Sequence, residues 1–383
     1  MAIAAGPLFT ELYEAQVDDL LMRICVELQL DETRSKLAEA NYRAVGRWLE
    51  SQNLVARLRP AIYPQGSMFL DTTVKPLSGD EYDLDFVCEF KCGTNFFRNP
   101  VDALNLIERS LRANDIYDPM VQRKNRCIRL NYAREFHLDI LPACKDPQNG
   151  GTCILVPDRQ LSEWTPSNPK GFGSWFNNRA RTITGRTLLE KAAPLPVQQT
   201  AERKPPLKLC VQLWKRWRDI RYRNNPEAAP ASIVLTTLAG RSYRGEESVT
   251  AAMENILEET SRAIQSAHPR LFVLNPSNGD EDLSERWASQ PGAYREFVSG
   301  VTDFNAQWKA LLQARGIEKV TRALEGLFGE EVAKRVVEKQ TREIEATRAR
   351  NGLGIKKTSG IVTGLAGTSV MPIRPNTFYG EEK

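Results

Sequence analysis

Two short segments alternate apolar and polar residues, and this pattern constrains the fold more than any other feature of the sequence. They are YDLDFV at residues 82–87 and FHLDILPA at residues 136–143. Because successive side chains of a β-strand point to opposite faces, Asp83 and Asp85 would share one face while their apolar neighbours face the other way. The sequence therefore predicts two core strands, and a strand pairing that places Asp139 beside the first two carboxylates.

The rest of the chain divides by pattern into three regions. Apolar residues recur at helical spacing over residues 8–52, which predicts one or two long amphipathic helices before the strands. Helical patterns return after a segment rich in Pro and Gly and continue to about residue 350. The predicted fold class is α+β with two lobes and a tail: N-terminal helices and α/β core at 1–200, a helical C-terminal lobe at 201–350, and a flexible tail at 351–383.

Composition excludes several classes of protein. The 383 residues carry 52 basic and 48 acidic side chains, a net charge of +4, which gives little general attraction to nucleic acid. Seven cysteines without a close-spaced framework, and two histidines, favour free thiols in a reducing compartment over disulfides or zinc. No secretory signal and no apolar window of ~18 residues is present. We expect a soluble cytoplasmic protein with no membrane partner and no nucleic-acid activator.

Three carboxylates in one place need protons or a cation. Like charges about 4 Å apart repel by roughly 4 kcal/mol at an effective dielectric near 20. Hard oxygen ligands suit Mg²⁺, and a pair of such ions can activate an attacking hydroxyl and stabilise the leaving oxygen at phosphorus. Asp83, Asp85 and Asp139 are therefore candidate catalytic residues and ligands of two Mg²⁺ ions, or of Mn²⁺. For either segment alone, an exposed acidic strand end is the simpler interpretation.

The tripeptide QGS lies shortly before the first acidic strand. Gly66 lacks a side chain and would allow the backbone to approach a phosphate, and Ser67 would add a hydroxyl donor where a helix begins. Phosphates would then be held beside the metal ions. Together the turn and the aspartates predict nucleotidyl transfer.

A Gly-Ser turn, then Asp-x-Asp on a strand, then a lone Asp on a later strand resembles the polymerase-beta-like nucleotidyltransferases. In the form PQGSMFLDTTVKP, EYDLDFV and HLDILPA it is similar to the bacterial cGAS/DncV-like nucleotidyltransferases, or CD-NTases. The resemblance extends to about residue 275 and implies a bilobal core with a mixed sheet, plus a helical C-terminal lobe. It assigns the magnesium ions to the three aspartates and the donor triphosphate to the turn residues Gln65, Gly66 and Ser67.

The resemblance also points to the helical lobe. In relatives such as cyclic GMP-AMP synthase, a lysine in one helix and a serine that opens the next helix reach the donor phosphates. The corresponding positions are Lys208 in LKLCVQLW and Ser232 in APASIVLTTL. The helix dipole disfavours a cation in the first turn, which a phosphate would offset. Ser232 could equally be a plain N-cap.

Two other features of this helix have simpler interpretations. Trp214 and Trp217 lie on its apolar stripe and are predicted to be core residues packed against the first lobe. The basic cluster is predicted to be a solvated helix face. Its members are Lys215, Arg216, Arg218, Arg221 and Arg223.

The resemblance implies a Mg²⁺-dependent enzyme that joins ATP and GTP into a cyclic di- or trinucleotide, cGAMP-like, with release of pyrophosphate, in antiphage (CBASS) signalling. The alternative is a nucleotidyltransferase that extends an RNA end or modifies a small-molecule acceptor. For the tail, a passive end is the simpler interpretation. The resemblance adds a conjugation or regulatory partner there, because some relatives are conjugated or bound at their C-termini.

Overall fold

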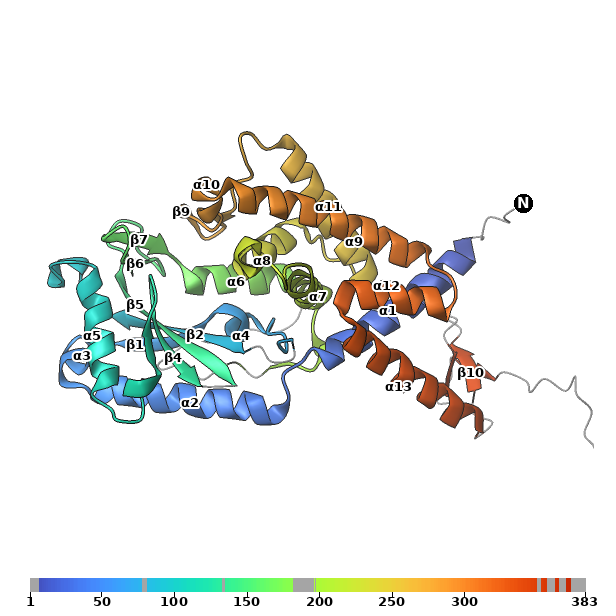
Figure 1. The fold of residues 1–383 in the computed structure, drawn as a ribbon, viewed down its shortest axis with the longest axis horizontal. Coiled ribbons are helices and arrows are strands. Elements are labelled where there is room, and N and C mark those ends of the chain that lie inside the picture. Colours follow the sequence, from blue (N-terminus) through green and yellow to red (C-terminus); the bar gives the residue numbers. More distant parts are fainter. Residues whose placement is uncertain are drawn as a thin grey trace, which may run out of the picture.

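A sheet lobe and a helical lobe meet along helix α7 (Pro206–Arg221), as Figure 1 shows. The structure is a computed structural model. It describes residues 7–77, 81–132, 135–181, 196, 198–349, 353–356, 362–364 and 370–372.

The two acidic segments form neighbouring strands at the centre of one mixed sheet. Strand β2 (Tyr82–Phe90) runs parallel to β5 (Phe136–Lys145), and the register places Asp85 opposite Asp139. This confirms the strand pairing expected from the alternation. The other strands of the sheet are β1 (Ala61–Gln65), β3 (Val121–Arg123), β4 (Ile128–Tyr132), β6 (Ile154–Asp158) and β7 (Glu163–Ser167).

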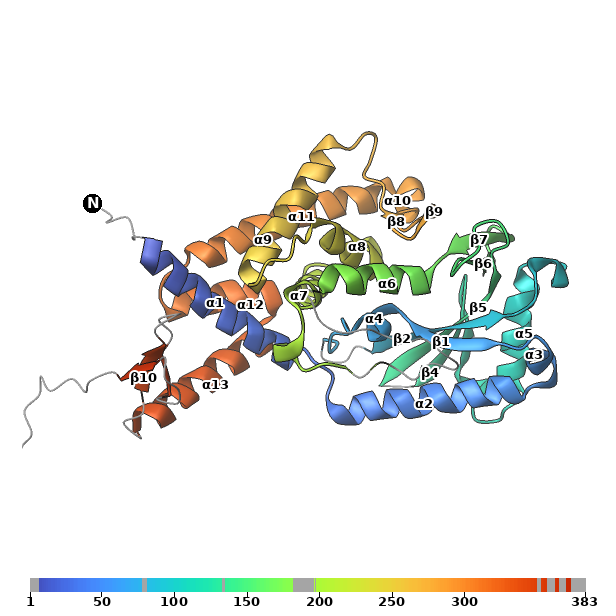
Figure 2. The same cartoon turned by 180° about the vertical axis from the view of Figure 1, so that it is seen from behind.

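The apolar face of these strands is covered by helices, which leaves the acidic face toward the helical lobe. Leu84 and Phe86 are fully buried, and Phe86 packs edge-on against Tyr42. The helices that share this core are α2 (Glu32–Ser51), which runs beneath the sheet in Figures 1 and 2, and α3 (Asn53–Arg57) and α5 (Val101–Arg112), which lie at its outer end.

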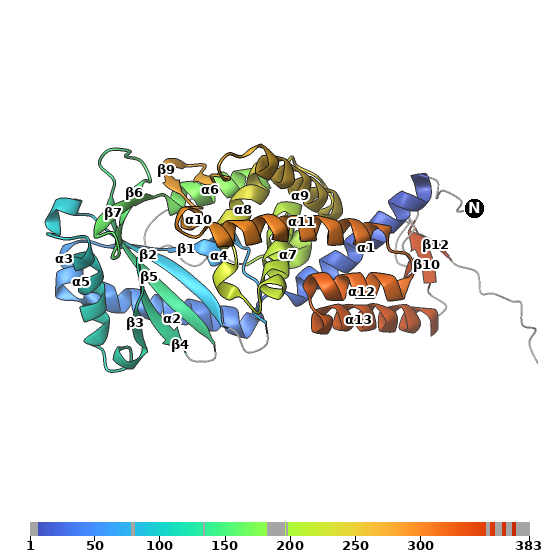
Figure 3. The same ribbon diagram turned by 45° about the horizontal axis from the view of Figure 1, so that its top comes forward.

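The helical lobe has its own core, and the N-terminal helix α1 (Pro7–Glu27) belongs to it. Leu21 and Ile24 of α1 are buried in one cluster with Trp214 and Trp217. The boundary predicted near residue 200 therefore does not coincide with the division between the two cores. Figure 3 shows α1 among the C-terminal helices. The other helices of this lobe are α6 (Pro169–Ala180), α7, α8 (Ser232–Ser242), α9 (Val249–Ser266), α10 (Arg286–Ser289), α11 (Pro291–Gln313), α12 (Ile317–Phe328) and α13 (Glu330–Ala349).

The two tryptophans of α7 are core residues, as predicted, but their partner differs from the expected one. The ring of Trp217 stacks on Phe304 of α11 at 4.6 Å between centroids. They therefore hold the helical lobe together, because α11 and not the sheet covers that side of α7.

Shorter elements complete the described chain. Within the segment predicted as a flexible tail, three short strands form an antiparallel sheet beside α13. The remaining elements are α4 (Gly66–Leu70), the hairpin β8 (Leu274–Asn275) and β9 (Asn278–Asp282), the tail strands β10 (Leu353–Lys356), β11 (Val362–Gly364) and β12 (Val370–Pro372), and 3₁₀ turns at Thr94–Phe96, Asp118–Met120, Ala201–Arg203 and Pro226–Ala228.

Two sequence expectations concern covalent and membrane features. All seven cysteines, each of them in the described ranges, are free thiols. Of the helices described, none combines the length and the apolar character needed to cross a bilayer.

Candidate active site

The three predicted carboxylates line one cleft between the sheet and the helical lobe. Its volume is about 660 Å³, within the usual range for small-molecule sites. The Asp83 side chain is 57% exposed and the Asp139 side chain 14% exposed, so Asp83 lies at the mouth and Asp139 inside. Residues from α7 and α8 form the opposite wall.

The crowding of negative charge affects the pKa of Asp85. Burial, and then the nearby charges of Asp83 and Asp139, raise the pKa of Asp85 to about 8. The cause is physical: both effects disfavour the ionised carboxylate. Negative charge is therefore concentrated around Asp85 in this part of the cleft.

Arg129 of β4 supplies part of that charge and is a residue that the sequence reasoning missed. Its guanidinium donates two hydrogen bonds of 2.7 Å to Asp139 and one of 3.1 Å to Asp83. Among the described residues, no three acidic, His or Cys side chains converge closely enough to hold one metal ion in this arrangement. The donor set itself, three carboxylates on one face, has the hard oxygen chemistry that Mg²⁺ prefers.

The Gly-Ser turn lies where the sequence places it, but Gly66 is required for a further reason. Helix α4 begins at Gly66, whose φ of +65° is left-handed, and a Cβ there would overlap the Asp85 carboxylate. Ser67 lines the cleft, and its hydroxyl accepts a 3.2 Å hydrogen bond from Thr73. Gln65 lines an adjoining depression that shares Gly66 and Asp85 with the cleft.

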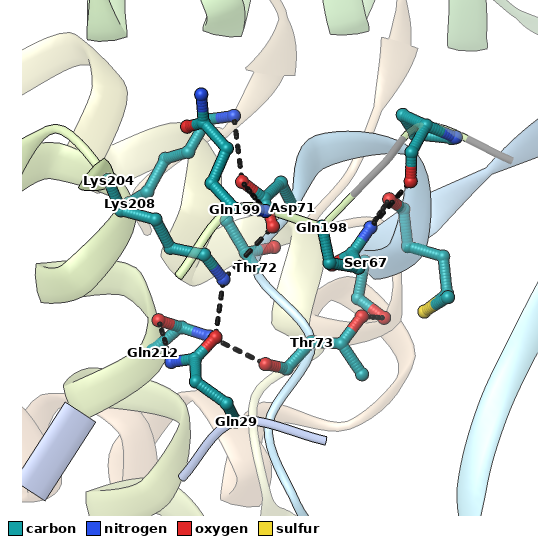
Figure 4. Close-up of polar contacts among 12 residues, drawn as sticks. Gln29, Ser67, Asp71, Thr72, Thr73, Gln198, Gln199, Lys204, Lys208 and Gln212 are labelled. Atoms are coloured by element: carbon teal, nitrogen blue, oxygen red, sulfur yellow. Dashed lines mark hydrogen bonds and ion pairs between the residues drawn. The ribbon is translucent and has the colours of Figure 1, made fainter. Parts of the chain in front are cut away.

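Lys208 is not brought to the carboxylates. Figure 4 shows Lys204 and Lys208 turned toward Asp71, whose carboxylate lies 3.0 Å from the first ammonium and 3.6 Å from the second. Burial lowers the pKa of Lys208, and Asp71 opposes that shift. The anion that offsets the unfavourable helix position is thus a protein carboxylate. Lys208 does not line the cleft.

The lysine that lines the cleft is Lys215, two helical turns further along α7. Its ammonium donates 3.1 Å hydrogen bonds to the carbonyl and hydroxyl oxygens of Thr72. Burial, reinforced by the neighbouring charge of Arg218, lowers the pKa of Lys215 to about 7. A buried ammonium with only neutral acceptors is well placed to receive a phosphate oxygen.

Ser232 does line the cleft, and it does not act as a helix cap. The N-cap position of α8 is Ala231, and Ser232 makes no capping hydrogen bond. Instead its hydroxyl accepts a hydrogen bond from Arg218, a further cation of the cleft, which also donates a 2.9 Å hydrogen bond to Asp219.

The prediction of a solvated basic face on α7 is wrong for its first members. Lys215 is 6% and Arg216 3% exposed, because both lobes pack on this helix. Arg221 does lie nearer the surface, where it pairs with Asp303 at 3.2 Å. Lys208 and Lys215 share one helix face, so spacing alone does not select between them. For Arg129 part of the signal was present: the alternation in RCIRLNY predicts that Arg129 faces away from Ile128 and Leu130, and the strand register then places it opposite Asp139.

Comparison with known proteins identifies the family. The family model for the Second Messenger Oligonucleotide or Dinucleotide Synthetase domain matches residues 16–180. Over 380 residues the chain is 34% identical to the c-di-GMP synthase of Roseivirga ehrenbergii, with 98% of this chain and 100% of that protein covered. The chain belongs to the bacterial CD-NTases.

Two further matches come from one other species and agree with this assignment. This CD-NTase is 28% identical to the cyclic dinucleotide synthase CdnG of Bradyrhizobium diazoefficiens, over 96% of this chain and 95% of that protein. A solved structure of B. diazoefficiens CdnG in complex with GTP superposes with a TM-score of 0.69 at 26% identity, covering 85% of this chain and 99% of that chain. The α+β fold expected from the sequence is thus the fold of the CD-NTases.

Proposed function

We propose that this CD-NTase joins two GTP molecules into c-di-GMP with release of pyrophosphate. The observation that carries the proposal is the cleft, in which three carboxylates face a Gly-Ser turn and a buried lysine. The choice of product is supported by the full-length relative at 34% identity, a c-di-GMP synthase. We propose c-di-GMP in place of the cGAMP-like product that the sequence favoured. The experiment below therefore tests whether ATP is required as a substrate.

The residues of the cleft have distinct proposed roles. Ser67 and Lys215 bind the donor triphosphate, one as a hydroxyl donor and the other as a cation. Asp83, Asp85 and Asp139 hold Mg²⁺, which when bound would supply charge stabilisation at the transferred phosphorus. Arg129 orients Asp139 through its paired hydrogen bonds. The sheet lobe and the helical lobe line one common cleft, so both substrates would lie together in it, which ring formation requires.

The test is incubation of the full chain with GTP alone, ATP alone and both, with Mg²⁺ and with EDTA. Phosphatase treatment and mass analysis then identify resistant products. We expect c-di-GMP from GTP alone, no product in EDTA, and none from the Asp139→Asn variant. A cyclic product that contains both bases and forms only with ATP present would support cGAMP as the product. Extension of an added RNA without a cyclic product would favour the alternative transferase.

An antiphage (CBASS) role is proposed as the biological context. It is tested by infecting cells that carry the chain with its neighbouring genes, against the same cells with Asp139→Asn. Protection only in the first strain supports the role, and equal plaque numbers contradict it.

A further inference from the structure

A second cavity lies beside the active-site cleft, between the end of α1, the loop before β2, α7 and the start of α13. Its volume is about 930 Å³, and six basic side chains line it against three acidic ones. Pro76 and Leu77 line both this cavity and the cleft. One short segment of chain therefore separates the two spaces.

The acidic side chains of this cavity are already neutralised. Glu330 pairs with Lys334, and Arg335 pairs with Glu331 at 3.0 Å and with Glu27 at 3.6 Å. Arg34 pairs with Asp31, outside the cavity lining, at 3.5 Å. Three cations are left over: Lys75, Arg216 and Arg223 have no carboxylate within ion-pair distance among the residues that the structure describes.

Arg216 is the cation among these three that is buried with an unpaired hydrogen-bond donor. The residue is only 3% exposed, and its Nε–H is buried without a hydrogen-bond acceptor. Its Nη2 donates a 3.2 Å hydrogen bond to the carbonyl of Lys75, on the segment that separates cavity and cleft. A buried guanidinium with an unused donor is costly, and an anionic ligand would remove that cost.

We propose that this cavity is an anion site, distinct from the active-site cleft, which binds a small molecule carrying a polyphosphate. Three uncompensated cations suit several phosphate oxygens, and the guanidinium of Arg216 can bind them in a forked geometry. The volume is large enough for a nucleotide-sized ligand. The proposal does not rest on the proposed function, because binding is measured without turnover.

The test is calorimetric titration of the full chain with inorganic tripolyphosphate in EDTA, where five acidic side chains line the cleft against three basic ones. We expect the Lys75→Ala/Arg223→Ala variant to bind at least about tenfold more weakly. Arg218→Ala, which alters the cleft, should bind within about twofold of wild type. The charge-matched control is Lys319→Ala/Lys339→Ala, which removes two exposed lysines of α12 and α13 outside the cavity and should also leave binding unchanged.

Three results would overturn the proposal: no binding by the wild type, equal weakening in the charge-matched control, or weakening only in Arg218→Ala. Arg223 is exposed, so the single Arg223→Ala variant keeps the test valid if the double variant melts early. A parallel titration with GTP distinguishes the ligands: tighter binding than tripolyphosphate, lost in the cavity variant, assigns the site to nucleotides.

Discussion

Asp85 is the residue where the electrostatics of the cleft can be measured most directly. Its pKa is about 3.8 in an unfolded chain and about 8 in the metal-free fold, chiefly because of burial. Between these values the folded state binds more protons than the unfolded state, so the free energy of unfolding falls as pH rises.

We therefore expect Asp85→Asn to stabilise the protein in EDTA while abolishing synthesis. The gain should be below about 1 kcal/mol at pH 4 and about 4–5 kcal/mol at pH 8, because asparagine has no proton to lose. Chemical denaturation of both proteins across this range measures it. A gain that is constant with pH would show that Asp85 ionises normally in the fold.

Substitutions of the two lysines of α7 should have different effects, one on substrate binding and the other on stability. Lys215→Ala should weaken binding of the donor triphosphate by on the order of 1 to 3 kcal/mol, seen as a higher KM for GTP. Lys208→Ala should leave KM unchanged and lower the free energy of unfolding by about 1–3 kcal/mol, since Asp71 loses one of two buried cations. A raised KM in Lys208→Ala, with an unchanged KM in Lys215→Ala, would show that Lys208 binds the substrate.

At the scale of elements, the junction of β1 and α4 depends on one glycine. Gly66→Ala must place a methyl group against Asp85 in a left-handed backbone conformation. We expect a loss of synthesis of at least about 100-fold and a loss of stability of about 1–3 kcal/mol. Ser67→Ala is the matched variant: it keeps the backbone, so stability should hold while KM for GTP rises. Near-normal synthesis by Gly66→Ala would mean that the turn has no part in positioning Asp85.

At the scale of the whole molecule, the described strands of the tail lie away from the active-site cleft. The cleft is lined by residues between Gly66 and Thr236, and the described tail strands contact α13 instead. Deleting residues 353–383 should leave synthesis in the test tube within about twofold of wild type.

The same deletion tests the proposed partner of the tail. If a conjugation or regulatory partner binds there, affinity purification from cells should recover it with the full chain and not with the truncated one. An identical set of co-purifying proteins would make the tail passive, and loss of synthesis on truncation would place it in the catalytic fold.

The sequence by itself determined the elements that carry the carboxylates. Strand alternation is local, so it predicted which face Asp83 and Asp85 share, and the order of the three motifs identified the family. Helical spacing likewise predicted the buried stripe of α7. These features depend only on residues close together in the chain.

Tertiary structure decided the partners of the cations. Lys208 and Lys215 occupy one face of one helix. Only the packing of the sheet lobe against α7 decides that Lys208 pairs with Asp71 and that Lys215 lines the cleft. The same packing buries Arg216, which the sequence assigned to a solvated face. Charge pairing across lobes involves residues more than a hundred positions apart, and no local pattern records which of them meet.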